Sequence, residues 1–321
     1  MIVVTGAAGF IGSCLVHALS RLSYDEIVAV DDFSKTYKDP NLSSLPSLMR
    51  IERDVFPQWL EAHGSRVQFV FHLGARTDTA EFDTALLNRL NLHYSQKIWD
   101  LCVRFSIPWV YASSAATYGL GEHGFSDQTH PSILKPLNPY GVSKNDFDLW
   151  VLEQKTAPPF WAGFKFFNVF GPNEYHKGRM ASVILHAYNQ IQQSGEVKLF
   201  QSHRSDYEHG MQQRDFVYIK DVIQVLLFAM EHRQQSGIYN LGSGEANTFN
   251  TLVESVFEAL ERAPQITYIP TPEDIRDTYQ YYTCARMDKL ISWGYSGGFT
   301  PFKEAVMDYT VHYLKKRQYF I

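Results

Sequence analysis

The segment "PYGVSK" carries two side chains with the spacing of a redox catalytic pair. Tyr140 and Lys144 are four residues apart in a pattern that predicts a helix over 140–155, and this spacing brings both to one helix face. A phenol is a poor base at neutral pH because its pKa is near ~10, and a neighbouring ammonium favours the phenolate. Upstream, "YASSAATYG" follows a predicted strand, so Ser113 or Ser114 could bind the reacting oxygen. These residue types suit hydride transfer between an alcohol and a ketone, in which the tyrosine moves the hydroxyl proton.

A glycine-rich turn near the start of the chain could bind the cofactor for such a reaction. Gly6, Gly9 and Gly12 separate a predicted strand at 2–5 from a predicted helix at 10–22. In dinucleotide-binding folds, the first glycine permits the tight turn and the second lets the pyrophosphate approach the backbone. The third lets the helix pack against the strand, and the helix N-terminus faces the phosphates. We therefore expect a dinucleotide cofactor at this turn.

Charged residues after the next strands bear on which dinucleotide binds. Asp31 and Asp32 end a predicted strand at 26–31. Asp31 alone favours NAD, because a carboxylate at this position binds the ribose 2′-hydroxyl. Lys38 and Arg53 follow strand ends that should lie beside the adenosine, and either could hold a 2′-phosphate. Each could equally be a solvated surface charge, so the residues alone leave NAD and NADP both open.

A cluster of basic residues lies in "GPNEYHKGRMAS", at the start of a helix predicted over 180–193. His176, Lys177 and Arg179 would crowd a helix N-terminus, where the helix dipole disfavours cations. One interpretation is a binding site for the diphosphate of a substrate. The other is a lysine whose pKa is lowered by its neighbours, so that Lys177 serves as a base. From the residues alone both remain open.

The order of elements predicts the fold. Strands are expected at 2–5, 26–31, 67–73, 108–113 and 162–168, and helices at 10–22, 83–105 and 140–155. Alternation of this kind implies a parallel sheet covered by helices on both faces. The predicted fold class is α/β, a Rossmann-type doubly wound parallel sheet with a smaller mixed α/β C-terminal substrate domain. We predict a cofactor-binding domain over 1–170 and a mainly substrate-binding domain over 171–321, with about 214–245 returning to the first domain.

Composition narrows the class of protein. The net charge of -5 over 321 residues argues against a general nucleic-acid binder. The apolar run "VIQVLLFAM" is too short to cross a bilayer, and the N-terminal sequence lacks the pattern of a signal peptide. The cysteines Cys14, Cys102 and Cys284 form no CxxC motif, which fits reduced thiols in the cytoplasm and no metal site.

Taken together, these motifs resemble the extended short-chain dehydrogenase/reductase family, many of whose members act on nucleotide sugars. The matching segments are "TGAAGFIG", "FHLGA", "YASSAATYG", "PYGVSK", "FNVFGP", "RDFVYIKDV" and "YNLGSG", which occur in the family's order. The resemblance implies that Ser114 is the catalytic serine. It also implies cofactor contacts beyond the glycines and charged residues already named, at Phe10, Ile11, Leu73, Gly74, Ala75, Arg76, Thr77, Asn91, Tyr140, Lys144, Val169 and Lys177.

The two residues after the catalytic serine narrow the reaction. Family members that eliminate water typically carry an Asp–Glu pair there, whereas this chain has Ala115 and Ala116. The segments "SSAATYG", "PLNPYGVSK" and "FNVFGPNEYHKGRMASV" resemble a subgroup of epimerases that act on a nucleotide-linked heptose for lipopolysaccharide core synthesis. This resemblance implies transient oxidation at C6″ by tightly held NADP, then hydride return to the opposite face. Tyr140 and Lys177 would be the two acid/base groups.

The same resemblance implies the remaining site residues and the assembly. Lys38 and Arg53 would hold the 2′-phosphate of NADP. A homo-oligomer is expected, a pentamer by family resemblance. A 4-epimerase, a keto-sugar reductase or a catalytically silent cofactor-binding module stay as alternatives, and the intact catalytic set weighs against the last. Substrate contacts are expected from Ser114, Asn168, Arg179, His186, Phe200, Gln201, Ser202, His203, Arg214 and Tyr279.

Overall fold

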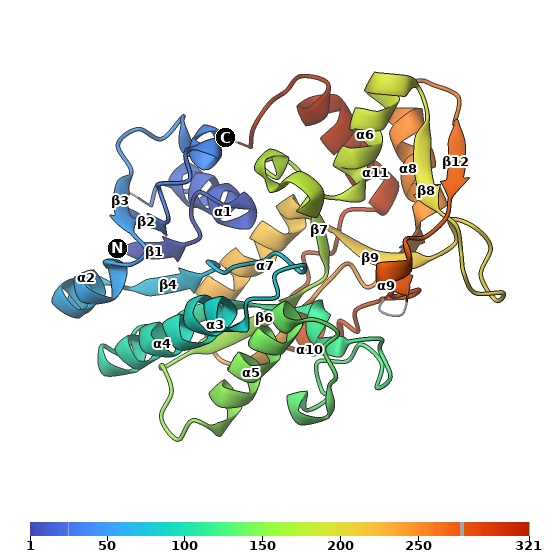
Figure 1. Ribbon diagram of the computed structural model, residues 1–321. Helices are drawn as coiled ribbons and strands as arrows, with labels where there is room; N and C mark the ends of the chain where they lie inside the picture. The colour runs from blue at the N-terminus through green and yellow to red at the C-terminus, as the bar shows by residue number, and fades with distance from the viewer. Residues whose placement is uncertain (25, 277–278, 321) are drawn as a thin grey trace.

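The computed structural model describes residues 1–24, 26–276 and 279–320, and its centre is a seven-stranded sheet (Figure 1). The strand order is β10-β6-β5-β4-β1-β2-β3, and every neighbouring pair is parallel. The predicted parallel sheet is therefore confirmed. Its strands are β1 (Ile2–Thr5), β2 (Ile27–Asp31), β3 (Met49–Glu52), β4 (Phe69–His72), β5 (Trp109–Ser114), β6 (Trp161–Phe166) and β10 (Gly237–Leu241).

Helices cover both faces of this sheet, which is the doubly wound arrangement. On one face α1 (Phe10–Arg21) and α7 (Ile219–Glu231) pack in a core with Val4, Phe71 and Phe164. On the other face α2 (Phe56–His63), α4 (Tyr94–Arg104) and α5 (Pro139–Glu153) pack around Trp99 and Trp109. Successive side chains of a strand point to opposite faces of the sheet, so each apolar strand contributes side chains to both cores.

The order of the strands reverses beside β1, because β2 lies on one side of it and β4 on the other. At such a switch point the loops after the strands diverge and leave a crevice at the carboxyl edge. The glycine turn after β1 and the loop after β4 border that crevice. The topology therefore creates the cofactor position that the glycine spacing predicts.

The chain also forms two smaller sheets, and in Figure 1 the strands β8 and β12 lie on the opposite side of the molecule from β3. One sheet has the order β11-β9-β7 and the other pairs β12 with β8. The bounds are β7 (Asn168–Phe170), β8 (Val197–Phe200), β9 (Gln213–Tyr218), β11 (Ala246–Thr248), β12 (Ile266–Ile269), α6 (Val183–Ser194), α8 (Phe249–Ala259), α9 (Glu273–Arg276), α10 (Asp288–Ser292) and α11 (Phe302–Asp308). Shorter helical segments are η1 (Thr36–Leu42), η4 (Ala115–Tyr118), η6 (Tyr175–Met180) and η7 (Tyr309–Leu314).

The chain crosses between the two regions several times. The strand β10 joins the large sheet next to β6, although it follows β8 and β9 in the sequence. The C-terminal segment packs against α1, since the guanidinium of Arg21 lies over the Phe320 ring. The backbone N–H of Phe320 also donates a hydrogen bond to the side chain of Asn173. The division at residue 170 and the return of 214–245 remain predictions about domains.

Three local features differ from the sequence-based expectation. The strand β3 and the helix α2 were not predicted, because "MRIE" is an exposed edge strand without an apolar run. The helix expected over 83–105 is interrupted: α3 (Thr84–Leu87) and α4 are joined by a π-helical segment, η3 (Asn88–His93). The helix expected from residue 180 begins only at Val183. Within the described residues, no helix is long and apolar enough to span a bilayer.

Candidate active site

A cleft of about 560 Å³ lies at the carboxyl ends of β1, β2 and β4. The glycine turn borders it on one side, and the loop after β4 borders it on another. Its position matches the crevice expected at the switch point. The cleft brings together these predicted cofactor residues: Gly6, Gly9, Phe10, Ile11, Gly12, Asp31, Asp32, Lys38, Arg53, Leu73, Gly74, Ala75, Arg76, Thr77 and Lys177.

The glycine turn is shaped so that no side chain fits. Gly6 has φ +68°, and a Cβ there would meet the backbone of Gly74 at 2.8 Å. A Cβ at Gly12 would lie 2.1 Å from the carbonyl oxygen of Gly6. Both approaches are possible only for glycine. The turn therefore keeps α1 and the loop after β4 close to β1, and it forms a backbone cradle that fits a dinucleotide pyrophosphate.

At the far end of the cleft, acidic side chains are paired with basic ones. Lys38 forms an ion pair with Asp31 and is 13% exposed. The Asp31 carboxylate also accepts hydrogen bonds from the backbone amides of Ala8 at 2.8 Å and Asp32 at 2.7 Å. Arg53 lies 3.8 Å from Asp32. Internal donors thus occupy the Asp31 carboxylate, and Arg53 also donates to Asp54 at 2.9 Å, so both cations at this end of the cleft are paired with carboxylates.

Asn91 lies behind the cleft and holds its wall. Its amide accepts a hydrogen bond from the backbone N–H of Arg76 at 2.8 Å and donates to the Arg76 carbonyl at 3.0 Å. It also donates to the Ser143 hydroxyl, which in turn donates to the Tyr140 carbonyl. Asn91 is buried. It therefore connects the loop after β4 to the first turn of α5, which carries Tyr140.

The Ser114, Tyr140 and Lys144 set is brought together by β5 and α5. Ser114 is the last residue of β5, and Tyr140 follows the N-cap residue Asn138 of α5. Burial raises the pKa of Tyr140, while the hydrogen bond with Ser114 lowers it. The lowering of the Tyr140 pKa that was expected from Lys144 is therefore not observed, because burial has the largest effect and the opposing effect comes from Ser114. Lys144 donates to the Ala112 carbonyl at 2.8 Å, and burial lowers its pKa to about 8.

Lys177 reaches the cleft from η6 rather than from a helix N-terminus. Its ammonium lies 5.5 Å from the centre of the Phe10 ring. Burial lowers the pKa of Lys177, and the carboxylate of Glu174 opposes that shift. Gly178 interrupts η6 with φ 54° and ψ -128°. A lysine with a lowered pKa beside the cleft has the chemistry of a general base.

The expectation of three cations crowding a helix start is wrong. The helix α6 begins at Val183 and is capped by the side chain of Ser182, beyond the basic residues. The buried carboxylate of Glu174 accepts from the backbone and hydroxyl of Ser182. His176 carries no charge near neutral pH, because burial lowers its pKa to about 4. The unfavourable interaction that the pattern predicted, between three cations and the dipole at the start of α6, therefore does not occur.

Arg179 lies in η6 and His186 lies in α6, on either side of the segment that joins these two helices. Arg179 is 67% exposed and forms an ion pair of 3.1 Å with Asp78, in the loop after β4. His186 lies in the first turns of α6, where its backbone N–H bonds the Ser182 carbonyl, and so does not share a helix with His176. The Arg179–Asp78 pair connects η6 to the opposite wall of the cleft.

A second group of predicted residues meets in the smaller sheets. The Phe200 ring lies 6.4 Å from the Tyr279 ring, and the His203 ring lies 6.2 Å from it. The guanidinium of Arg214 lies over Tyr279 at 5.5 Å. Gln201 and Ser202 lie in the same loop as His203, and Asn168 and Val169 lie on β7 beside β9. This cluster of aromatic rings and one arginine suits a nucleoside base and its phosphates.

Several residues of the site were not foreseen. The cleft is also lined by Thr5, Val30, Lys35, Tyr37, Asp78, Leu86, Arg89, Leu90, Tyr94 and Met180, and by His176 of the predicted basic cluster. Most of them lie in loops or short helical segments without a clear periodic pattern. Asp148 and Lys165 form a fully buried ion pair of 2.6 Å. Both could have been found: Asp148 continues the four-residue spacing of Tyr140 and Lys144, and Lys165 is a lone charge within the apolar strand "AGFKFFN".

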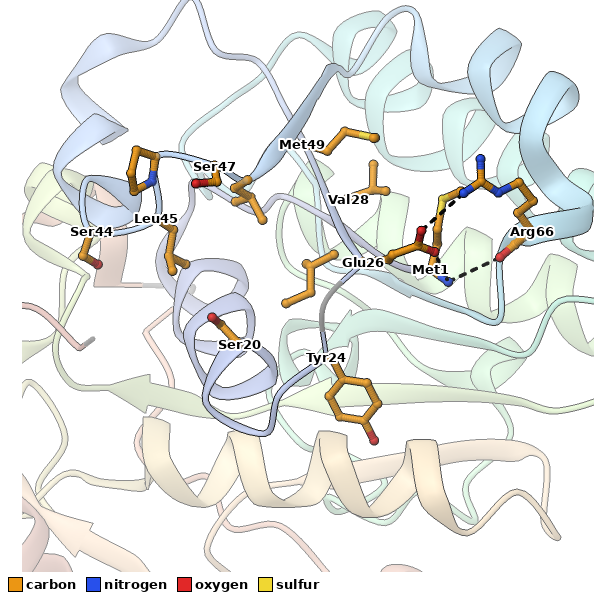
Figure 2. A pocket seen from close by; sticks show the side chains of 13 residues that line it. Met1, Ser20, Tyr24, Glu26, Val28, Ser44, Leu45, Ser47, Met49 and Arg66 are labelled. Carbon is orange, nitrogen blue, oxygen red and sulfur yellow. Dashed lines mark hydrogen bonds and ion pairs between the residues drawn. The ribbon is translucent and has the colours of Figure 1, made fainter.

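A second cavity, of about 440 Å³, lies at the opposite edge of the sheet (Figure 2). Glu26 accepts from Arg66 at 3.3 Å and lies 3.6 Å from the N-terminal ammonium of Met1. These charges satisfy one another at the amino ends of the strands, away from the crevice where such sheets bind ligands. Within the described part of the chain, no group of three or more His, Cys, Asp or Glu side chains could hold a metal ion.

Comparison with known proteins extends over the whole chain. The model of the NAD dependent epimerase/dehydratase family matches residues 2–242. The chain is 40% identical over 332 residues to the ADP-L-glycero-D-manno-heptose-6-epimerase of Fusobacterium nucleatum, with 100% of both chains covered. It is 43% identical over 325 residues to the protein of that name from Nitratidesulfovibrio vulgaris, also with 100% of both covered.

Solved structures agree with this comparison. The ADP-L-glycero-D-manno-heptose-6-epimerase of Helicobacter pylori superposes with a TM-score of 0.81 at 29% identity, covering 97% of this chain and 95% of that chain. A UDP-glucose 4-epimerase of Thermus thermophilus in complex with NAD superposes with a TM-score of 0.78 at 25% identity, covering 98% of each. The likeness therefore extends through both the large sheet and the smaller sheets.

Proposed function

The chain belongs to the NAD dependent epimerase/dehydratase family, and from this premise we propose that it is an ADP-L-glycero-D-manno-heptose 6-epimerase. The reaction is inversion at C6″ of ADP-D-glycero-D-manno-heptose, which supplies a precursor of the lipopolysaccharide core. The observation that carries the proposal is identity of 40% and 43% to two such epimerases over the full chain. The presence of Ser114, Tyr140 and Lys144 at the end of β5 and the start of α5 supports it.

The proposed mechanism uses one acid/base group on each face of the sugar carbon. Tyr140 removes the C6″ hydroxyl proton of one epimer, while Ser114 hydrogen-bonds the same oxygen and Lys144 favours the phenolate. A nicotinamide dinucleotide held by the glycine turn and the loop after β4 would supply the hydride acceptor and donor for C6″. After the ketone turns over, Lys177 protonates the oxygen from the opposite side. The pKa of Lys177 is lowered by burial, which supports this role over a permanent cation on a diphosphate.

The cofactor is a nicotinamide dinucleotide, and we propose NADP as the preferred form. Lys38 and Arg53 line the end of the cleft where the adenosine ribose should lie, and Lys38 is paired with Asp31. The paired Asp31 carboxylate has little capacity left for a ribose diol. The two cations could instead form charge-assisted hydrogen bonds with a 2′-phosphate.

The remaining proposals concern the substrate and the assembly. Phe200, His203, Arg214 and Tyr279 would hold the ADP group, since their rings and guanidinium form one cluster. Asn168, Arg179, His186, Gln201 and Ser202 are proposed as further substrate contacts, and Val169 as a further cofactor contact. We also propose a cytoplasmic homo-oligomer, a pentamer by family resemblance, which light scattering of the purified protein would test.

Proton NMR of the purified enzyme with ADP-D-glycero-D-manno-heptose tests the main proposal. New anomeric signals of the 6-epimer should appear without net change in cofactor absorbance, and Tyr140→Phe should lack them. A mixture that stays unchanged at high enzyme concentration contradicts the assignment. UDP-glucose is the matched comparison, because its conversion would point to a 4-epimerase, and net cofactor oxidation with a keto-sugar would point to a reductase.

The same mixture in D₂O tests the hydride route. If the hydride stays on the cofactor between the two steps, the product carries hydrogen at C6″. Deuterium at C6″ would instead indicate removal of a proton next to a carbonyl, which the roles of Tyr140 and Lys177 do not include.

A further inference from the structure

A buried ion pair lies directly behind the proposed catalytic set. The Nζ atom of Lys165 is 2.6 Å from Oδ2 of Asp148, and the two side chains are 1% and 0% exposed. Asp148 is on α5, and Lys165 is on β6, in register with Ser113 of β5. Removing two charges from water is unfavourable, and a buried pair by itself is weak evidence for stability. Its contacts indicate another role.

The pair holds the segment that carries Ser114. The Asp148 carboxylate accepts hydrogen bonds from the Tyr111 hydroxyl at 2.9 Å and the Ser113 hydroxyl at 2.7 Å. From the other side, Lys165 donates to the Thr117 hydroxyl at 2.7 Å, and that hydroxyl donates to the carbonyl of Ser114 at 2.9 Å.

Ser114 thus lies between two residues that the ion pair binds. Ser113, before it, donates to Asp148, and Thr117, after it, accepts from Lys165. Lys165 Nζ also lies 5.2 Å from the centre of the Tyr118 ring, and the Tyr118 hydroxyl donates to Asn240 on β10. The end of β5 and the turn η4 are therefore fixed to α5, β6 and β10 at once. A shift of the pair would move the Ser114 backbone.

Asp148 also acts on Lys144. Tyr140, Lys144 and Asp148 succeed one another at four-residue intervals on α5, so their side chains share a helix face. Burial lowers the pKa of Lys144 to about 8, and the negative charge of Asp148 opposes this shift. The titratable groups that face Lys144 or Asp148 are His72 on β4, Tyr111 on β5, Tyr118 on η4, Tyr140 on α5 and Lys165 on β6.

We propose that Asp148 and Lys165 are positioning residues for the catalytic set: Asp148 keeps Lys144 in its ammonium form, and the pair together holds Ser114 in place opposite Tyr140. The relevance of this to catalysis rests on the proposed function, in which Tyr140 needs a charged Lys144. Lys165 limits the effect of Asp148 by balancing its charge and orienting its carboxylate, so the two residues have opposite electrostatic effects on Lys144.

The first experiment needs no substrate. The full chain with its cofactor is labelled with ¹³C at the lysine ε-carbons, and Lys144 is observed by NMR from pH 6 to 10, with its signal assigned from Lys144→Met. In Asp148→Asn the Lys144 titration should move down by about one pH unit or more, since a nearby opposite charge typically shifts a pKa by about 1–3 units. In Lys165→Met it should stay in place or move up.

The opposite responses separate this role from a purely structural one. Loss of packing would move the midpoint of the Lys144 titration in the same direction in both variants. That result overturns the proposal, and so does an unchanged midpoint in Asp148→Asn. Because a single variant leaves an unpaired buried charge and could fail to fold, the double variant Asp148→Asn/Lys165→Met is measured too. It has no unpaired charge, and its Lys144 titration should lie between those of Asp148→Asn and the wild type, because the opposing charge of Lys165 is removed as well. Asp148→Glu keeps the charge and should restore the wild-type midpoint.

Activity provides the second readout. In Asp148→Asn, kcat for the 6-epimerisation should fall by about fivefold at pH 8 for a one-unit shift from a pKa of about 8, with KM changed far less and the alkaline limb of the pH profile displaced to lower pH. Asp148→Glu should recover most of kcat. If the wild-type protein does not convert ADP-D-glycero-D-manno-heptose, the proposed function fails, while the lysine titration still decides whether Asp148 controls Lys144.

Discussion

Lys38 forms an ion pair with Asp31 at the end of β2, and the same carboxylate accepts a hydrogen bond of 2.8 Å from the backbone amide of Ala8. The acidic residue that would otherwise favour NAD therefore supports the glycine turn and neutralises a lysine. Under the proposed preference for NADP, the groups left to contact the adenosine ribose and its phosphate at this end of the cleft are Lys38 and Arg53. This relationship links cofactor choice to the geometry of the turn.

Lys38→Ala should weaken binding of NADP much more than binding of NAD. A charge-assisted hydrogen bond is worth about 1.5–3 kcal/mol, so the NADP Kd should rise by about 10- to 100-fold. The Kd values are measured by fluorescence titration of cofactor-free protein with each dinucleotide. Lys97→Ala, an exposed lysine on α4, is the control and should change neither value. Equal loss for NAD and NADP would contradict recognition of a 2′-phosphate.

Lys177→Ala and Lys177→Arg together distinguish a base from an anion contact. A general acid/base group contributes about 10²–10⁴ in rate. If Lys177 is the second base, both variants should lose kcat on that scale with KM little changed. If it binds diphosphate, Lys177→Arg should keep near-normal activity, because the guanidinium retains the charge and the hydrogen bonds. Steady-state kinetics of the epimerisation measure both parameters, and a raised KM with kcat preserved would contradict the base role.

The stability of the protein should decrease at acid pH because of His72. This buried imidazole is hydrogen-bonded through Nδ1 to the Thr5 hydroxyl at 2.8 Å and through Nε2 to the Ser95 hydroxyl at 2.9 Å. Burial lowers its pKa to about 3. Between about pH 6.5 and 3 the unfolded state binds more protons at this group than the folded state, so stability rises with pH across that window. Well below pH 6 the slope from His72 approaches about 1.4 kcal/mol per pH unit.

Urea unfolding of wild-type protein and His72→Gln at several pH values from 4 to 7 measures this effect. Glutamine does not titrate, so the free energy of unfolding of the variant should have the smaller slope, whatever its absolute stability. His17 and His176 also have lowered pKa values from burial and contribute the same slope to both proteins. Parallel curves for the two proteins would show that His72 is not held neutral by the fold.

Glu174 should be important for stability, since its buried carboxylate organises the turn before α6. It accepts from the Ser182 amide at 2.6 Å, the Ser182 hydroxyl at 2.6 Å and the Gly171 amide at 3.3 Å. Glu174→Gln has one acceptor oxygen fewer and leaves buried donors unpaired, so the free energy of unfolding should fall by about 1–3 kcal/mol. Glu254→Gln, at an exposed position on α8, should change it by less than about 0.5 kcal/mol. Urea denaturation measures both, and equal values would contradict the role of Glu174.

Local sequence was sufficient for the parts of the site that depend on neighbouring residues. Three glycines between a strand and a helix predict the phosphate turn, because close backbone approaches there exclude any Cβ. The spacing of Tyr140 and Lys144 predicts that both side chains lie on one face of a helix, because four residues complete about one helical turn. The alternation of strands and helices predicts the parallel sheet, because parallel strands need crossover connections. These inferences need only short-range geometry.

Tertiary structure decided the features that join distant segments. "HKGR" reads as the beginning of a helix, yet α6 begins only after its cap residue Ser182, which donates to Glu174, and Lys177 lies beside Phe10. The edge strand β3 has no apolar pattern, because one side of it faces solvent. Burial, which no local pattern reveals, determines that the pKa of Lys144 and Lys177 is lowered and that of Tyr140 is raised.

The sequence by itself thus determined the fold class, the glycine turn and the Tyr140–Lys144 pair, since each is encoded in the spacing of nearby residues. Only the folded chain decided that Lys38 neutralises Asp31, that Asp148 and Lys165 lie buried behind the catalytic helix, and which side chains lose their contact with water. The physical reason is that charge pairing and desolvation depend on distances through space between β-strands and helices, and these distances are set by the packing of the whole sheet.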